Sequence, residues 1–154
     1  QMGWTPLLFA SCFVFYGSAH WLSSMYTGAL VDRFSGVQLL KLYPLPMLLG
    51  LFIPAVTSGN WVAYTLMILL GTSIGSGSPI ISALWAEVYG TKHLGAIRAL
   101  ISSLAVISTS ASPILFGFLI DGGISGQELF MWLDFYVLVA MLLSLFSFSA
   151  KQVL

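Results

Sequence analysis

Charge is scarce in this chain. Of its 154 residues, five are Lys or Arg and five are Asp or Glu, together 6%, whereas 58% are apolar. Soluble domains average about a quarter charged residues, so a soluble surface cannot be built from this composition. Charge-free windows cover residues 1–31, 42–86, 99–120 and 135–150, and a membrane span needs about 20 apolar residues. The sequence therefore predicts that lipid surrounds most of the chain.

Cysteine is scarcer still, since Cys12 is the only one. A single cysteine inside a span excludes an intrachain disulfide and a cysteine metal cluster, and free Cys readily acts as a small buried hydrophobe. We expect no metal, no cofactor and no nucleic-acid partner. The chain begins with Gln and has no basic segment ahead of its first apolar run, so we expect no signal peptide and interpret the chain as a fragment.

The long apolar runs divide into five expected spans. The window 42–86 is too long for one span, and TSGN at residues 57–60 is a turn-forming cluster inside it. We interpret this window as a helical hairpin. The expected fold is all-α: a single polytopic membrane domain over residues 1–154, with spans at about 6–28, 39–56, 61–84, 98–120 and 129–150.

The basic residues predict the orientation in the membrane. With alternating spans, all of them fall in loops on one side; they are Arg33, Lys41, Lys92, Arg98 and Lys151. The loops of the other side carry Asp121 and Glu128 and no basic residue. By the positive-inside rule the basic side is cytoplasmic. We expect an integral protein of a plasma membrane or bacterial inner membrane, with the amino terminus outside and the carboxyl terminus inside.

Three spans carry a polar or small-residue face at helical spacing. On the first span this face holds Tyr16, His20, Ser23, Ser24 and Thr27. On the third it holds Gly71, Gly75, Ser78 and Ser82, and on the fourth Arg98, Ser102, Ala105, Thr109 and Ser112. Pro79 is expected to bend or break the third span. The second span has no Ser, Thr, Asn, Gln or His, so it and the similar fifth span are expected to face mainly lipid.

The small-residue faces allow two interpretations. Glycine and Ser/Thr spacing lets membrane helices pack closely, and it also suits helices that border a water-filled path, where Gly and Pro are tolerated. We interpret Gly71 and Gly75 as packing residues, whereas Tyr16 and His20 are too large for close approach and favour the path. The residues expected to serve helix packing or kinking are Gly71, Gly75, Pro79, Pro113 and Gly117.

Two ionisable residues fall inside spans. His20 lies about 18 Å along a helix from Asp32, near the middle of the membrane, where an ionisable group is a functional candidate. The alternative is a neutral histidine that is hydrogen-bonded to a neighbouring helix. Asp134 lies five residues into the fifth expected span, and we interpret it as an interfacial residue.

The charged loops resemble those of a known family. GALVDRFSG at residues 28–36 resembles the GxxxDRxG loop motif of the major facilitator superfamily of secondary transporters. AEVYGTKHLGAIRAL at 86–100 and SASPILFGFLIDGG at 110–123 resemble the loop between its tenth and eleventh helices and the eleventh helix itself. Phe34 and Ser35 stand between Arg33 and Gly36, where the family often has one residue. The resemblance implies an MFS-like half bundle, in which the five spans are helices eight to twelve and the amino-terminal half is missing.

The resemblance implies a transporter that works by alternating access. In the family, helices eight, ten and eleven line the substrate cavity, and these would be the spans with polar faces. The residues expected to border the cavity are Tyr16, His20, Ser24, Ser76 and Ser112. Those expected to form the cytoplasmic gate are Gly28, Asp32, Arg33, Gly36, Glu87 and Arg98. The expected partners are a small organic solute, the lipid bilayer and the missing half.

Other functional classes compete with transport. A membrane-embedded enzyme would need convergent catalytic groups, but His20 is the only titratable side chain in the middle of a span apart from Cys12, so we do not expect an enzyme. A non-transporting scaffold or sensor subunit stays open, because this chain cannot enclose a pathway alone. The loop charges themselves could also simply mark the ends of the spans and set topology.

Overall fold

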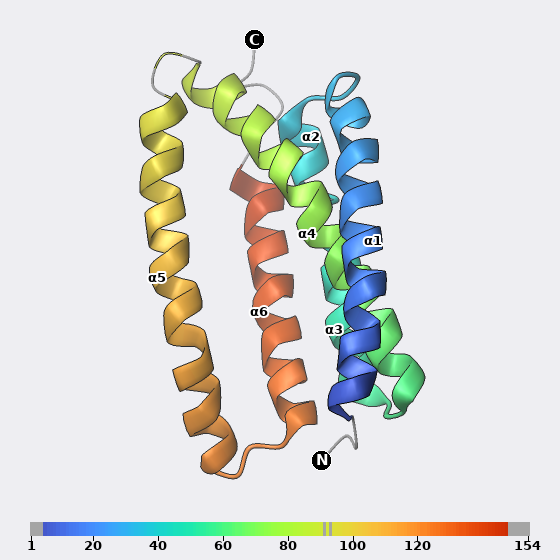
Figure 1. Cartoon of the computed structure of the whole chain (residues 1–154). Helices are drawn as coiled ribbons and strands as arrows, with labels where there is room; N and C mark the ends of the chain where they lie inside the picture. The colour runs from blue at the N-terminus through green and yellow to red at the C-terminus, as the bar shows by residue number, and fades with distance from the viewer. Residues whose placement is uncertain (1–4, 91, 93, 148–154) are drawn as a thin grey trace.

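The fold is a bundle of α-helices (Figure 1). The computed structural model describes residues 5–90, 92 and 94–147, and these form helices and turns without any strand, which confirms the expected all-α class. In chain order the helices are α1 (Pro6–Val31), α2 (Gly36–Leu40), α3 (Leu45–Val56), α4 (Asn60–Tyr89), α5 (Leu94–Asp121) and α6 (Gly126–Ser147). In Figure 1, α1 meets α2 and α4 meets α5 at the upper end, while α3 meets α4 and α5 meets α6 at the lower end.

Local sequence signals explain several helix ends. The Thr5 hydroxyl caps α1 and accepts a hydrogen bond from the Leu8 N–H at 3.3 Å. Helix α6 begins with a capping box: the Glu128 N–H donates to Ser125 Oγ at 3.2 Å, and the Ser125 N–H donates to the Glu128 carboxylate at 2.8 Å. Helix α4 ends at Gly90, whose φ of 70° is readily adopted by glycine. These ends lie within a few residues of the expected ones.

Within the part of the chain that the structure describes, four helical segments are long and apolar enough to cross a membrane, which indicates an integral membrane protein. They are Gly36–Val56, Asn60–Tyr89, Leu94–Asp121 and Gly126–Leu145, and they match the second to fifth expected spans. Helix α1, the first expected span, has 26 residues and no charge, but its hydroxyls and His20 leave it outside this group. Residues 148–150 of the fifth expected span, and Lys151, lie outside the described residues.

Pro79 was expected to bend or break the third span, and of these the break does not occur. Helix α4 continues from Asn60 to Tyr89 with Pro79 inside it, and α5 likewise continues through Pro113. A proline removes one backbone hydrogen bond from a helix. In a membrane span no water competes for the remaining backbone groups, so the helix on either side of the proline is retained.

Helix α4 lies at the centre of the packing. Both α1 and α3 pack against it, and α3 also packs against α6 (Figure 1). Where α3, α4 and α6 meet, Leu51, Leu66 and Val137 are buried together. The expectation that the second and fifth spans face mainly lipid therefore needs correction for one face of each, because aliphatic side chains pack against a neighbouring helix as readily as against lipid.

Helix α5 stands apart from this packing. None of its residues is buried, and it approaches α4 beside the turn that joins the two helices. In Figure 1 it runs along the outside of the bundle. A long apolar helix with no buried side chain leaves most of its surface to lipid or to a partner.

Candidate functional site

The closest helix contact is the seam between α1 and α4. A Cβ atom added at Gly71 would lie 2.5 Å from the Tyr16 carbonyl oxygen, and one added at Gly75 would overlap the His20 carbonyl oxygen and the Ser23 hydroxyl. Real Cβ atoms do not approach other atoms so closely, so only glycine fits at either position. The Ser23 hydroxyl donates within the seam, to His20 O at 3.1 Å and Gly71 O at 3.5 Å. This geometry agrees with the packing interpretation of both glycines.

A polar contact extends the seam toward the lower end of the bundle. Ser11 Oγ of α1 and the Tyr64 hydroxyl of α4 are hydrogen-bonded at 2.8 Å. The Tyr64 ring also meets the edge of Phe15, with ring centroids 5.4 Å apart. Interhelical hydrogen bonds of this kind hold membrane helices in register where apolar packing alone would not.

The five residues expected to border a cavity are not gathered in one place. The rings of Tyr16 and His20 lie on one face of α1 with centroids 6.0 Å apart, and both side chains are half-buried. Ser24 is also half-buried on α1, and Ser112 is half-buried on α5, where its hydroxyl donates to Ser108 O at 3.0 Å. Ser76 lies elsewhere, in a pocket that none of the other four residues lines.

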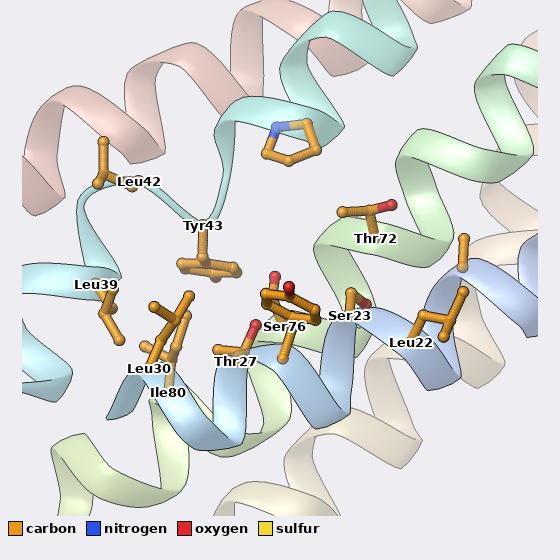
Figure 2. Close-up of a pocket in the computed structure, with 13 residues that line it drawn as sticks. Leu22, Ser23, Thr27, Leu30, Leu39, Leu42, Tyr43, Thr72, Ser76 and Ile80 are labelled. Atoms are coloured by element: carbon orange, nitrogen blue, oxygen red, sulfur yellow. The ribbon is translucent and has the colours of Figure 1, made fainter. Parts of the chain in front are cut away.

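This pocket, which we call the lateral pocket, has a volume of about 600 Å³. Its walls come from residues 19–30 of α1 and 39–46 of the α2–α3 region, and residues 72–80 of α4 form its floor. In Figure 2, Thr27, Tyr43 and Ser76 approach the same space from these three elements. No charged residue lines it. Such a lining can hold an uncharged molecule by apolar contact and hydroxyl hydrogen bonds.

The hydroxyls of the lateral pocket differ in their bonding. Ser76 Oγ donates to Ser73 O at 2.9 Å and Thr72 Oγ1 donates to Ile68 O at 2.9 Å, both within α4. The hydroxyls of Thr27 and Tyr43 form no hydrogen bond to any residue that the structure describes. The Tyr26 hydroxyl, which also lines the pocket, likewise has no hydrogen bond to a described residue, so these three hydroxyls are the groups most available to a ligand.

Sequence reasoning missed Tyr43. Apart from Lys41, the second span was expected to offer nothing polar to a neighbour and to face mainly lipid. The Tyr43 carbonyl, however, accepts a hydrogen bond from Ser73 Oγ at 2.8 Å, and the Tyr43 ring lines the lateral pocket. The signal was present, because Tyr43-Pro44 is followed by Pro46 and two prolines at this spacing mark a turn. A turn exposes backbone carbonyls that a continuous helix would satisfy itself.

At the upper end, one hydrogen bond connects the start of α2 to the last turn of α4. The Gly36 N–H at the start of α2 donates to Glu87 Oε1, near the end of α4, at 2.7 Å. Gly36 also packs directly on the α4 backbone, since a Cβ there would lie 2.7 Å from Leu84 N. A carboxylate is favourable beside the N–H groups at a helix start and unfavourable at a helix end. The hydrogen bond to Gly36 therefore offsets the unfavourable position of the Glu87 carboxylate near the end of α4.

The other expected gate residues are placed differently. Asp32 and Arg33 are exposed, and no ion pair forms among the residues that the structure describes. Arg98 instead donates a hydrogen bond to Ser82 Oγ, beside a small pocket of about 160 Å³ between α4 and α5. No atom lies within 4 Å of the place a Cβ would take at Gly28, and the same is true of the expected packing residue Gly117.

Neither a metal site nor a similar known protein identifies the function of this chain. Within the described part of the chain, no three His, Cys, Asp or Glu side chains gather in a way that could hold a metal ion. Comparisons with protein-family models, with curated proteins and with solved structures gave no match. The functional argument therefore depends on the residues themselves and on the motifs in the loops.

Proposed function

We propose that this chain is most of the carboxyl-terminal half of a major facilitator type transporter, which moves a small uncharged or weakly charged organic solute by alternating access. The observation that carries the proposal is the hydrogen bond between Gly36 and Glu87. It joins the start of α2 to the last turn of α4, within the two segments whose sequences resemble the family motifs. In such transporters two halves rock about a site near the middle of the membrane.

The bond fixes the loop that presents Asp32 and Arg33. Both side chains are exposed and have no ion-pair partner among the described residues, so their charges are available to the other half of the transporter. Contacts between the halves at this end would hold the outward-open state and break as the protein turns inward. The end that carries these loops is cytoplasmic in this proposal, in a plasma membrane or bacterial inner membrane.

The uncovered surfaces of the chain also support the proposal. Helix α5 has no buried residue, and α1 keeps Tyr16, His20 and Ser24 only half-buried. A second six-helix half would cover such surfaces and enclose a path that this chain cannot enclose alone. The solute would pass between these faces and meet hydroxyl and imidazole groups rather than full charges.

Uptake by the intact parent protein in proteoliposomes tests the proposal. We expect uptake of at least one member of a panel of sugars, amino acids and organic anions. Glu87→Ala should slow it about two- to tenfold, since a hydrogen bond contributes about 0.5–1.5 kcal/mol, and Asp32→Asn should also slow it. Asp121→Asn is the matched control, because Asp121 is an exposed acid at the opposite end. Absence of uptake by well-folded, full-length protein would favour a scaffold or sensor subunit.

His20 provides a separate test of proton coupling. Imidazole can both accept and donate a proton, and the centroid of the His20 ring lies 6.0 Å from that of the Tyr16 ring near the middle of α1. If it carries the coupling proton, His20→Gln abolishes stimulation of uptake by a pH gradient while uptake down a solute gradient continues. Gradient stimulation that survives the substitution excludes His20 from coupling and leaves the transport proposal intact.

A further inference from the structure

Asp134 lies inside a span and on its packed face. It is the ninth residue of α6, about 12 Å from the helix start, within the apolar segment Gly126–Leu145. Phe130, four residues earlier, and Val137, three residues later, share its side of the helix and pack in the hydrophobic cluster between α3, α4 and α6. The interpretation of Asp134 as an interfacial residue did not anticipate this face.

The carboxyl of Asp134 lacks an internal partner. Its Oδ1 atom is buried and has no hydrogen bond to any residue that the structure describes. The side chain as a whole is half-buried. One oxygen is therefore enclosed by the protein, while the group can still be reached from the apolar side of the helix.

No cation faces Asp134 from the helices around it. Helix α3 has no titratable side chain, and Tyr64, the nearest titratable residue of α4 in sequence to the cluster, is bonded to Ser11 of α1. Where α5 approaches α6, the residues that line the space between them are all apolar and lie within positions 115–133. Arg98 of α5 is hydrogen-bonded to Ser82 at the opposite end of the bundle.

The neighbours on α6 and its preceding loop are equally unable to compensate a charge. Glu128 is exposed and belongs to the capping box. Tyr136 is 71% exposed, and Asp121 is an exposed acid at the end of α5. The groups nearest in sequence are thus two acids and an exposed phenol that forms no hydrogen bond to Asp134, and none of them is a cation.

We infer that Asp134 is a membrane-embedded carboxyl that binds a proton at neutral pH, and that it is the site in this chain where an apolar carbodiimide reacts. An ionised carboxylate without a partner is costly in an apolar environment, and such groups take up a proton instead. Glu128 differs because it accepts a backbone N–H donor in water, which favours its ionised form. The inference does not depend on the proposed transport.

The reaction requires only the protonated acid and the reagent. The carboxyl oxygen adds to the central carbon of dicyclohexylcarbodiimide, and the acid proton moves to one nitrogen, which gives an O-acylisourea. Transfer of the acyl group from oxygen to nitrogen then yields a stable N-acylurea. No group leaves and nothing is oxidised or reduced, so the modified peptide gains the mass of one reagent molecule.

Peptide mass spectrometry of the intact parent protein in liposomes tests the inference. After dicyclohexylcarbodiimide treatment at neutral pH, we expect modification of Asp134, decreasing as the pH rises because the acid loses its proton. Asp134→Asn should abolish modification of this peptide, while Glu128→Gln and Asp121→Asn leave it unchanged. A water-soluble carbodiimide with an added amine should give the reverse pattern, with Glu128 and Asp121 modified and Asp134 spared.

Two results would overturn the inference. One is a folded, monodisperse protein in which dicyclohexylcarbodiimide leaves Asp134 unmodified or modifies Glu128 to the same extent. The other is a lower unfolding temperature for Asp134→Asn, because asparagine replaces a neutral carboxyl with little change in shape or charge. Whatever its result, this experiment leaves the uptake test unaffected, since neither readout measures transport.

Discussion

At the scale of single residues, two glycines of α4, which have no side chain, determine where α1 and α4 meet. Gly71 and Gly75 place the α4 backbone against Tyr16 and His20 of α1. Their role in packing could be predicted from spacing alone, because small residues four apart lie on one helix face. Gly117 and Gly28 look similar in sequence, yet nothing lies within 4 Å of their Cβ positions. Spacing identifies a face that can pack, but the partner comes from the tertiary structure.

Alanine substitution separates these glycines. Inside a helix, replacing Gly by Ala is favourable by about 1 kcal/mol, so Gly117→Ala should raise the unfolding temperature in detergent. Gly75→Ala should lower it, because an added methyl in a filled site costs about 1–3 kcal/mol and here would meet His20 and Ser23. Equal shifts of the two variants would mean that the α1–α4 seam is not close-packed.

The bond between Ser11 and Tyr64 permits a second residue-scale test. Tyr64→Phe removes the hydroxyl that lies 2.8 Å from Ser11 Oγ, and we expect a loss of about 0.5–1.5 kcal/mol of stability. Tyr136→Phe is the matched control, because the Tyr136 side chain is 71% exposed. Thermal unfolding in detergent measures both. A Tyr64→Phe variant as stable as the control would show that the bond contributes nothing.

At the scale of elements, the helices could be predicted but not their neighbours. Hydropathy identified residues 36–56, 60–89, 94–121 and 126–145 closely, because a span must be apolar over a fixed length. It could not show that α3 lies between α4 and α6, since aliphatic residues suit lipid and protein alike. The turn before α3, which Pro44 and Pro46 mark in the sequence, was missed, and with it the contact between Tyr43 and Ser73.

The loop between α1 and α2 depends on one residue of α4. Without the carboxylate of Glu87, the Gly36 N–H loses its acceptor, so Glu87→Ala should speed hydrogen exchange of the Gly36 amide about two- to tenfold, as expected for one lost hydrogen bond. Asp32→Ala changes an exposed residue of the same loop and should leave that amide unchanged. If both variants exchange at the wild-type rate, Glu87 does not hold this loop.

At the scale of the whole molecule, the candidate site could be predicted only in part. Gly36 and Glu87 were both expected at the gate, and the structure joins them, because a motif glycine and a helix-terminal acid are recognisable in sequence. Ser76 was grouped with His20 on the basis of polarity, but it lies in the lateral pocket instead. Polarity shows that a face is not lipid-facing and does not show which neighbour it meets.

The orientation of the molecule can be tested with two cysteines. Cys12 is fully buried, and Cys12→Ala removes the one thiol of this chain. In this variant, Ser58→Cys at the lower end should react with an impermeant maleimide added to intact cells, whereas Arg33→Cys at the upper end should react only after permeabilisation. Both positions are exposed, so the reverse pattern would invert the proposed topology.

The dependence of α1 on α4 has a consequence for synthesis. Helix α1 is synthesised before α4, but it is not among the described segments that are long and apolar enough by composition to cross a membrane, and its closest packing is against Gly71 and Gly75 of α4. Insertion machinery releases helices into lipid according to their hydrophobicity. Helix α1 should therefore stay near that machinery until α4 arrives, so that the pair enters the bilayer as a hairpin-like unit and the order of translation differs from the order of integration.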